Sequence, residues 1–451
     1  MVDANNLADY DALTEVFEWE SMYAEADWDA PGTINIAHEV CDRHATKRGT
    51  VALYYVGRDD ERERITYWEL AQWSNRFANV LSTVDVDRGD RVFAYLPRIP
   101  ERFVSMLGTL KAGSVFGSID RRHDASELRE RLIDARPSAV LTTPDRREVV
   151  AEALEDVSPR PEVIVVSDDG RGIRRGDVSF HAAMERASPT YDTIETVGSD
   201  PALLYYTRGT TGDPKGVVHG HRWIIGIAAA QLYAADLHQH ETDLYWGAGR
   251  LGWLTAPVNK LGVWFWGHSL LIYHGAFEAE RWIELLDAFP VTIFAGVPEI
   301  YEALTDHEDR LDHADIELRE ALSTGAPLDD TLVDWGEEFL NVPIRETYGQ
   351  AETGNMIINS YPSIENRTGA LGKPLPGVTV GIIDPETGEQ RDQGEVGQIA
   401  VRDDFPSFFR GYWEDADRTE EAFVDGWYLT GDLGTRDGDG YVSFEGRDSR
   451  R

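Results

Sequence analysis

Apolar and polar residues follow two different periods along residues 91–168. Residues 92–96 are a short apolar run, as expected of a buried strand, whereas residues 101–113 repeat apolar side chains at helical spacing. Strands that alternate with helices imply a mainly parallel sheet covered on both faces. The alternation continues with predicted strands at 115–119, 139–141 and 163–166 and a polar-faced helix at 124–135.

A second unit with this pattern extends from residue 202 to about residue 366 and includes apolar runs at 291–294 and 344–347. Beyond residues 369–377 the pattern changes to short β-type runs separated by Gly and Asp turns. These runs, at 378–383, 396–401 and 441–444, predict a small barrel-like subdomain.

We therefore expect an α/β fold with two mainly parallel sheets, flanking helices and a small β-barrel-like subdomain. A chain of 451 residues exceeds one small core, so several packed subdomains are expected. The predicted boundaries are 1–195 for the first α/β subdomain, 196–368 for the second, and 369–445 for the β-rich subdomain.

The charge balance narrows the choice of partners. The formal net charge is −38, from 81 acidic and 43 basic residues, and five of the basic residues are lysines. An acidic surface with arginine in place of lysine is typical of adaptation to high salt, and it repels nucleic acid and anionic membranes. A cationic substrate is the alternative explanation, but the acidic residues are spread over the whole length, which favours a role in solvation.

Targeting signals and thiol chemistry are not indicated. The N-terminus has neither a basic start nor an apolar core, so we expect no secretion signal and a cytoplasmic protein. The longest apolar stretches, 223–235 and 263–276, are shorter than the roughly 20 uninterrupted residues of a membrane span. Cys41 is the single cysteine, so it forms no internal disulfide and is expected to be a small buried residue.

Residues 204–220 form a loop suited to phosphate, because glycines and hydroxyls follow directly after an apolar strand. Glycines let backbone N–H groups turn toward an anion, hydroxyls add donors, and Lys215 adds a compact positive charge. The loop is not a Walker motif, since Pro214 precedes the lysine. Its candidate ligands are Thr207, Gly209, Thr210, Thr211, Gly212 and Lys215.

This loop closely resembles the phosphate loop of the adenylate-forming enzymes, which include acyl-CoA synthetases, luciferases and peptide-synthetase adenylation domains. Arg208 stands where that family usually has serine. Further motifs resemble the family in the same order, at 323–328, 346–354 and 427–434, and a fourth begins at 444–447. The resemblance implies the large domain of these enzymes and the activation of a carboxylic acid with ATP, Mg²⁺ and coenzyme A.

The resemblance also assigns roles to residues. Lys215 and Glu352 would be catalytic, with residues 207–215 cradling the phosphates and Glu352 binding Mg²⁺, a cation that prefers oxygen ligands. Tyr348 would stack on adenine and Asp432 would accept hydrogen bonds from the ribose hydroxyls. The other implied nucleotide contacts are Arg208, Gly325, Ala326, Pro327, Glu346, Thr347, Gly349, Gln350, Ala351 and Arg447.

Each role has a plainer alternative. Taken alone, Glu352 is a surface charge, Tyr348 is a core tyrosine and Asp432 belongs to a Gly-Asp turn. Ala351 replaces the threonine that the family usually has, so we expect weaker adenylation.

Gly349 is informative about the carboxylic acid substrate, because members of the resembled family that are restricted to acetate carry tryptophan at this position. A glycine would leave the acyl pocket open, and the apolar residues of 246–266 would line it, which favours a medium-chain, branched or aromatic acid. For about half of these apolar residues, ordinary packing in the hydrophobic core is the alternative. The candidate pocket residues are Trp253, Val258, Leu261 and Gly349.

A metal site at the closely spaced histidines is weakly indicated. His219 with His221, and His238 with His240, could place two imidazoles on one side of a strand. No cysteine or clustered carboxylate in the sequence completes a zinc-binding set there.

Relatives in the resembled family continue beyond the Gly-Arg motif into a small mobile domain that supplies a catalytic lysine. Here residues 446–451 read as a remnant of the hinge, no lysine follows Lys373, and a separate C-terminal domain is a possible partner. Three interpretations stay open: an acyl-CoA synthetase, an adenylating enzyme that loads a carrier protein, and a nucleotide-binding remnant without turnover.

Overall fold

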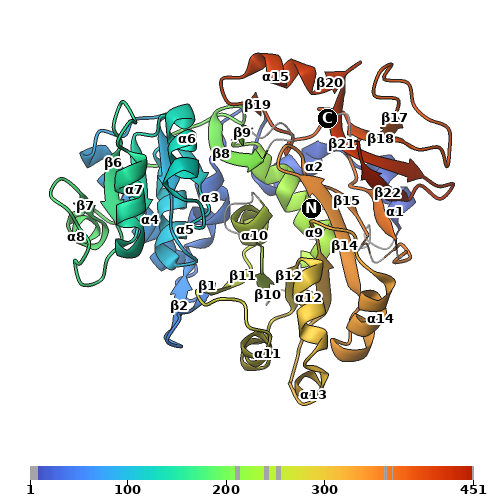
Figure 1. Ribbon diagram of the computed structural model, residues 1–451, viewed down its shortest axis with the longest axis horizontal. Helices are drawn as coiled ribbons and strands as arrows, with labels where there is room; N and C mark the ends of the chain where they lie inside the picture. The colour runs from blue at the N-terminus through green and yellow to red at the C-terminus, as the bar shows by residue number, and fades with distance from the viewer. Residues whose placement is uncertain are drawn as a thin grey trace.

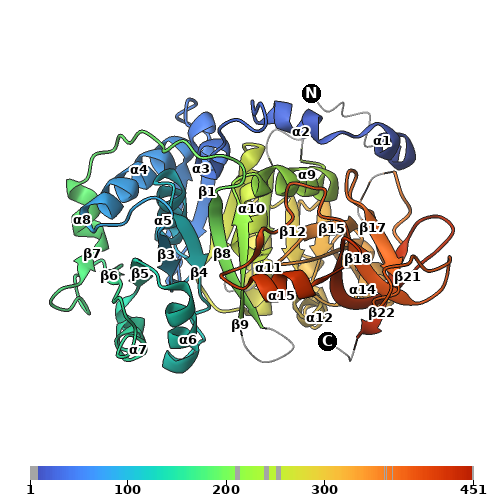
Figure 2. The ribbon, with the colours of Figure 1, turned by 90° about the horizontal axis from the view of Figure 1, so that it is seen from above.

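The protein is built on two β-sheets with helices packed against them (Figure 1). The computed structural model describes residues 9–208, 214–237, 243–249, 255–359, 361, 363–367 and 369–448. Seen from above, the first sheet and the second sheet lie side by side, and the C-terminal strands extend the second (Figure 2). The mixed α/β fold predicted from the sequence is confirmed.

Among the described residues, the first sheet contains eight strands in the order β19-β9-β8-β4-β3-β5-β6-β7. The pairs from β8 to β7 are parallel, whereas β9 is antiparallel to β8 and β19 is antiparallel to β9. The bounds are β3 Arg91–Ala94, β4 Val115–Ser118, β5 Ala139–Thr142, β6 Glu162–Val165, β7 Val178–Ser179, β8 Pro201–Arg208, β9 Pro214–Gly220 and β19 Gly411–Tyr412.

Helices α5, α6 and α7 connect parallel strands of this sheet, as the alternating pattern predicts, and α4 joins β2 of the second sheet to β3. Helix α4 begins with a capping box, in which the Thr66 hydroxyl accepts from the Glu69 backbone while the Glu69 carboxylate accepts from Thr66. Helix α5 begins with Pro100, whose missing N–H costs nothing at that position. The bounds are α4 Tyr67–Thr83, α5 Pro100–Lys111, α6 Ala125–Ala135, η3 Pro144–Arg146, α7 Arg147–Ala153 and α8 Phe180–Arg186.

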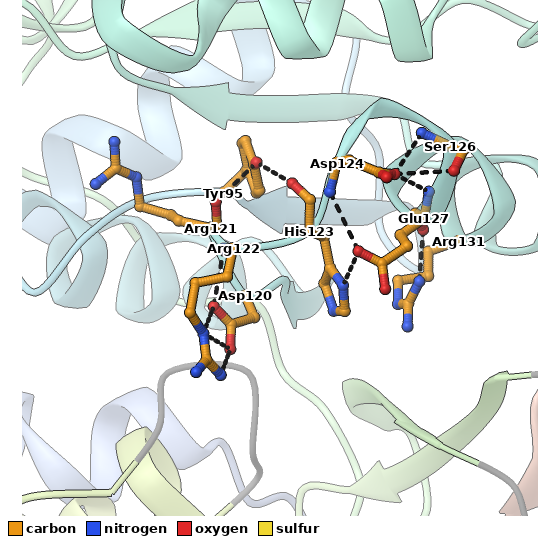
Figure 3. A network of polar contacts seen from close by, with 9 residues as sticks. All are labelled: Tyr95, Asp120, Arg121, Arg122, His123, Asp124, Ser126, Glu127 and Arg131. Atoms are coloured by element: carbon orange, nitrogen blue, oxygen red, sulfur yellow. Dashed lines mark hydrogen bonds and ion pairs between the residues drawn. The ribbon is translucent and has the colours of Figure 1, made fainter.

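The polar run before α6 fixes the turn at the carboxyl end of β4 (Figure 3). Asp124 accepts from the backbone of Ser126 and Glu127, and Glu127 accepts from the Asp124 backbone at 3.2 Å. The Tyr95 hydroxyl donates to the carbonyl of His123 at 2.7 Å. The side chains of this polar run cap α6 and stabilise the turn before it.

The second sheet contains fourteen strands within the part of the chain that the structure describes. Its parallel part has the order β14-β13-β12-β10-β11-β1, in which each strand pairs parallel with the next. Strand β2 covers the edge beyond β1 and pairs antiparallel with it. These strands are β1 Val51–Val56, β2 Arg62–Thr66, β10 Leu244–Gly247, β11 Ser269–Tyr273, β12 Ile293–Gly296, β13 Glu320–Ser323 and β14 Ile344–Gln350.

The β-rich end of the chain continues the same sheet by antiparallel pairing of β14 with β15, β15 with β16 and β16 with β22. The sheet then passes through β21 and β18 to β17, and β20 pairs with β21. The bounds are β15 Gly354–Ile358, β16 Ala370–Pro374, β17 Val380–Ile383, β18 Gly397–Val401, β20 Phe423–Val424, β21 Trp427–Arg436 and β22 Val442–Arg447.

Helix α9, Trp223–Ala235, is buried along its whole length and packs against α10, β15 and α2. Within the described residues, no helix is long and apolar enough to cross a membrane. Cys41 is buried, as expected. The remaining helices are α1 Tyr10–Val16, α2 Trp19–Glu25, α3 Ile36–Val40, η2 Asp42–His44, α10 Thr255–Phe265, α11 Ala279–Ala288, α12 Pro298–Thr305, α13 Glu308–Leu311, α14 Asp330–Phe339 and α15 Ala416–Glu421.

Sheet membership does not follow the expected boundary at residues 195 and 196. Strands β8 and β9 come after it and yet belong to the first sheet, whereas β1 and β2 precede it and belong to the second. Hydrophobic periodicity identifies each strand, but the pairing partner is chosen by contacts far away in the sequence. The two sheets therefore exchange strands across the predicted boundary.

Candidate active site

Strands β8 and β9 hold the two ends of the predicted phosphate loop. They pair antiparallel, with Thr207 opposite Lys215. The amine of Lys215 lies 5.2 Å from the centre of the Tyr412 ring, a cation–π distance. The other predicted loop ligands, Gly209, Thr210, Thr211 and Gly212, lie outside the described residues, as does the side chain of Arg208.

Glu352 is buried near Lys215 and is held by a tyrosine from another element. The Tyr412 hydroxyl, on β19, donates to Oε1 of Glu352 at 2.9 Å. Burial raises the pKa of Glu352, while the Tyr412 hydrogen bond and the positive charge of Lys215 act in the opposite direction. A buried carboxylate that keeps acceptor capacity beside a cation has the chemistry to bind a hard metal ion.

Asp432 is fixed by three side chains. Its Oδ2 accepts from the Tyr348 hydroxyl at 2.7 Å and from Nε2 of Gln350 at 3.0 Å. Its Oδ1 lies 3.3 Å from Nε of Arg447, which stands opposite Asp432 in the pairing of β21 with β22. Burial raises the pKa of Tyr348 well above its ordinary value, and the negative charge of Asp432 adds to the effect. The carboxylate is therefore preorganised to accept further hydrogen bonds.

Tyr428 lies beside both parts of the site. Its hydroxyl donates to Oε1 of Gln350 at 3.2 Å, and Gln350 in turn donates to Asp432. Burial, together with the negative charge of Glu352, raises the pKa of Tyr428 well above its ordinary value. Sequence reasoning missed Tyr412 and Tyr428. Tyr428 lies inside the motif at 427–434, whereas no signal in the sequence marked Tyr412.

The loop after β13 is tied to β14. Gly325 has a φ of +97°, a left-handed conformation that explains the glycine, and it precedes Ala326 and Pro327. The Thr347 hydroxyl donates to the carbonyl of Ser323 at 3.4 Å. Burial raises the pKa of Glu346 to about 7, with a hydrogen bond from the Leu328 backbone acting against the shift. The predicted adenine loop and the predicted adenine-stacking strand are therefore brought together.

Gly349 faces strand β15 and not an open space. A Cβ at this position would lie 1.9 Å from the carbonyl oxygen of Gly354 and 2.8 Å from the Cα of Asn355. The glycine is explained by the close approach of two backbones, because no side chain fits between them. The expectation that Gly349 opens an acyl pocket is therefore not supported by this geometry.

The structure describes some of the residues predicted to line the acyl pocket. Leu261 is fully buried in the main hydrophobic core, beside Trp264, whose indole N–H donates to the carbonyl of Ala52 at 2.8 Å. Trp253 and the side chain of Val258 lie outside the described residues.

Lys260 is a candidate that the sequence did not indicate. It is 2% exposed, and burial lowers its pKa to about 7, helped by the charges of Arg98 and Arg102. Arg98 in turn donates to the carbonyl of Gly249 at 3.0 Å, at the carboxyl end of β10. These cations meet where the two sheets approach each other.

The first histidine pair belongs to the core. His219 Nε2 contacts the carbonyl of Ala351 at 2.7 Å, and burial lowers the pKa of His219 to about 4. His221 Nδ1 accepts from the backbone of Ile36 at 3.1 Å. His238 and His240 lie outside the described residues. The described pair has structural partners, so the spacing of its histidines does not indicate zinc.

Comparisons with known proteins identify a family. A family model described as AMP-binding enzyme matches residues 41–413. The acetyl-coenzyme A synthetase of Bacillus subtilis (strain 168) is 32% identical over 98% of this chain and 77% of its own length. That of Methanothrix thermoacetophila is 31% identical over 96% of this chain and 70% of its own. The solved structure of Brucella canis acyl-CoA synthetase has a TM-score of 0.90 at 27% identity, covering 98% of this chain and 80% of that one. The chain belongs to the AMP-binding enzyme family.

Proposed function

We propose that this protein is an acid–thiol ligase that uses ATP to activate a carboxylic acid and transfers the acyl group to coenzyme A. In the first step the carboxylate oxygen attacks the α-phosphorus, the bond to the bridging oxygen breaks, and pyrophosphate leaves. In the second step the coenzyme A thiol attacks the acyl carbon and AMP leaves. The observation that carries the proposal is the set of donors that fixes two carboxylates: Tyr412 donates to Glu352, whereas Tyr348 and Gln350 donate to Asp432.

The residues around Glu352 and the ends of the loop suit the phosphate end of a nucleotide. Lys215 and Thr207, at the mouth of the loop, would contact phosphate oxygens, and Lys215 would neutralise the departing pyrophosphate. Glu352 would hold the Mg²⁺ that accompanies ATP, since its buried carboxylate suits a hard cation. Mg²⁺ would neutralise charge on the phosphates.

The nucleoside would lie toward β21. Asp432, already fixed by hydrogen bonds, would accept from the ribose hydroxyls, with Arg447 beside it. Tyr348 would offer its ring to adenine, and the backbone of Gly325, Ala326 and Pro327 would border the base. The Tyr348 hydroxyl is bonded to Asp432, so base and sugar contacts would be set by the same pair.

Carboxylate-dependent exchange of pyrophosphate into ATP tests the proposal. Lys215→Ala and Glu352→Gln should each lower the exchange rate by about 10² to 10³, because each removes a group that stabilises charge in the transition state. Lys47→Ala and Glu395→Gln, which change exposed residues of the same types, should leave the rate near that of the wild type. Equal rates in the active-site variants and these controls would overturn the assignment.

For the acid, a medium-chain, branched or aromatic carboxylate is our proposal, and it rests on the apolar residues of 246–266. Gly349 no longer supports it, because its missing side chain faces backbone. Acetate is the alternative suggested by relatives that carry the name acetyl-coenzyme A synthetase. Pyrophosphate release with acetate, butyrate, octanoate, isovalerate and benzoate would decide: a preference for acetate would contradict the proposal.

We also propose that the protein works in high salt. With a net charge of −38, self-repulsion destabilises the compact state until cations screen it. The melting temperature should rise steeply between dilute buffer and molar KCl. A melting temperature that is constant over this range would contradict this proposal.

A further inference from the structure

A cavity lies where α5 and α8 begin. Its volume is about 1060 Å³, and its lining comes from both sheets, including Tyr55 of β1 and Thr143 after β5. The lining is markedly acidic. Its carboxylates are Glu61, Glu63, Glu101, Asp168, Asp169 and Glu185.

Three side chains in this cavity converge on one point. Glu101 is the second residue of α5, Asp168 follows β6, and His181 is the second residue of α8. Nε2 of His181 lies 3.2 Å from Oδ1 of Asp168 and 3.7 Å from Oε1 of Glu101, and one ligand atom from each residue lies within 4.8 Å of the others. Ligands about 2.1 Å from a tetrahedral metal ion are separated by about 3.4 Å, so these spacings match a coordination sphere.

The imidazole gives an independent sign of a missing ligand. Nε2 of His181 is closed off from solvent, yet among the described residues no hydrogen-bond partner satisfies it. Asp168 is near enough, at 3.2 Å, but the contact lacks hydrogen-bond geometry. Nε2 of His181 lies within ion-pair distance of both carboxylates without a hydrogen bond to either, as a metal ligand does, in a site open enough that the side chains of His181 and Asp168 are 35% and 97% exposed.

The electrostatics of Glu101 point the same way. Asp168 and Glu63 both lie close enough to Glu101 for their negative charges to act on it. Arg76 also lines the cavity, but its guanidinium donates to the backbone carbonyl of Met184 at 3.1 Å. A divalent cation would compensate the gathered negative charge.

We propose that Glu101, Asp168 and His181 form a binding site for a first-row divalent transition-metal ion such as Zn²⁺, separate from the nucleotide site. One imidazole and two carboxylates suit such ions, whereas Mg²⁺ and Ca²⁺ prefer all-oxygen ligands. Three protein ligands leave further positions for water. The ion would join the first turns of α5 and α8 to the end of β6.

Metal retention by the full chain tests the site. The chelator-treated protein is equilibrated with ZnCl₂ in molar KCl, which suppresses weak binding to the acidic surface. After dialysis, the wild type should retain one Zn²⁺ per chain, measured by atomic absorption, and an equal concentration of Mg²⁺ should not displace it. Co²⁺ in place of Zn²⁺ should give visible absorption bands typical of a low-symmetry site.

Variants separate this site from general attraction to negative charge. His181→Ala and Glu101→Gln should weaken Zn²⁺ binding by about tenfold or more, since even partners of metal ligands are worth that much. Glu185→Gln removes the same charge from the same lining without touching the three ligands, so it should bind as the wild type does. Zn²⁺ should raise the melting temperature of the wild type and of Glu185→Gln, but not of His181→Ala.

Two results would overturn the proposal. If the wild type retains no Zn²⁺, the three side chains form an ion pair only. If His181→Ala and Glu185→Gln retain Zn²⁺ equally, the ion binds elsewhere. Glu101→Gln keeps the size of the side chain, so a folding failure of His181→Ala would not obscure the result.

Discussion

Carboxylates gather in two regions of this molecule, and their surroundings differ. Around Glu352 and Asp432, tyrosine hydroxyls and an amide from other strands donate directly to the carboxylate oxygens. Around Glu101 and Asp168, the neighbouring imidazole is close but forms no hydrogen bond to them. The first region has its geometry fixed by the chain itself, whereas the second has charge and spacing that an external cation would complete.

The two regions therefore differ in how freely their carboxylates can move before a ligand binds. Preorganised acceptors lose little conformational freedom when a ligand binds. Removing one of their hydrogen-bond donors should therefore change the ligand affinity. The cavity cluster is less constrained, and its members lie on the first turns of two helices and after one strand. Perturbing one region should leave the other unaffected, because they share no residue of the described chain.

The largest expected effect comes from Gly349→Ala. The new Cβ would lie 1.9 Å from the Gly354 carbonyl oxygen, so β14 and β15 must move apart. We expect a loss of about 3 kcal/mol in the free energy of unfolding, at the upper end for overpacking, together with weakened ATP binding. Urea unfolding and ATP titration measure both.

The matched control is Gly49→Ala. A Cβ at Gly49 meets nothing within 4 Å, and this glycine has no positive φ, so its stability should be unchanged or slightly higher. Zn²⁺ retention in Gly349→Ala should equal that of the wild type if the folded protein can be prepared. Equal stability of the two alanine variants would contradict the close approach of β14 and β15.

Asp432→Asn should have the next largest effect. The amide keeps the size of the side chain but removes the charge that accepts from Tyr348 and Gln350, and it cannot accept as strongly from ribose hydroxyls. Hydrogen bonds to charged groups are worth about 1.5–3 kcal/mol, so the KM for ATP should rise by about tenfold to a hundredfold. Asp425→Asn, at an exposed position just before β21, is the control. An unchanged KM in Asp432→Asn would remove Asp432 from the nucleotide site.

Tyr412→Phe should have the smallest effect and is the most specific test. The Tyr412 hydroxyl lowers the pKa of Glu352, so its loss should raise that pKa further. If Glu352 binds Mg²⁺ through its ionised carboxylate, activity should fall as the pH drops through this pKa, and the acidic limb of the pH–rate profile should shift to higher pH in the variant. A net hydrogen bond of about 1 kcal/mol corresponds to a shift of under one pH unit. A shift to lower pH would contradict the role of Tyr412.

The sequence by itself determined the elements and the chemistry of the loop. Strands at β4, β5 and β6 and helices at α5 and α6 follow from hydrophobic period, because one face or both must be buried. The motifs that contain Glu352, Tyr348 and Asp432 indicated which residues to examine, and the structure brings these residues together. Their roles toward ATP stay predictions that the variants above test.

Tertiary structure alone decided the rest, since it depends on contacts between distant residues. Periodicity could not show that β8 and β9 join the first sheet while β1 joins the second. Nor could it show that Gly349 faces a backbone or that Tyr412 donates to Glu352 across 60 positions. The histidine spacing indicated residues that pack in the core, whereas the cavity cluster combines side chains from positions 101, 168 and 181. Local patterns specify local structure, and a site built from separate segments exists only after the chain has folded.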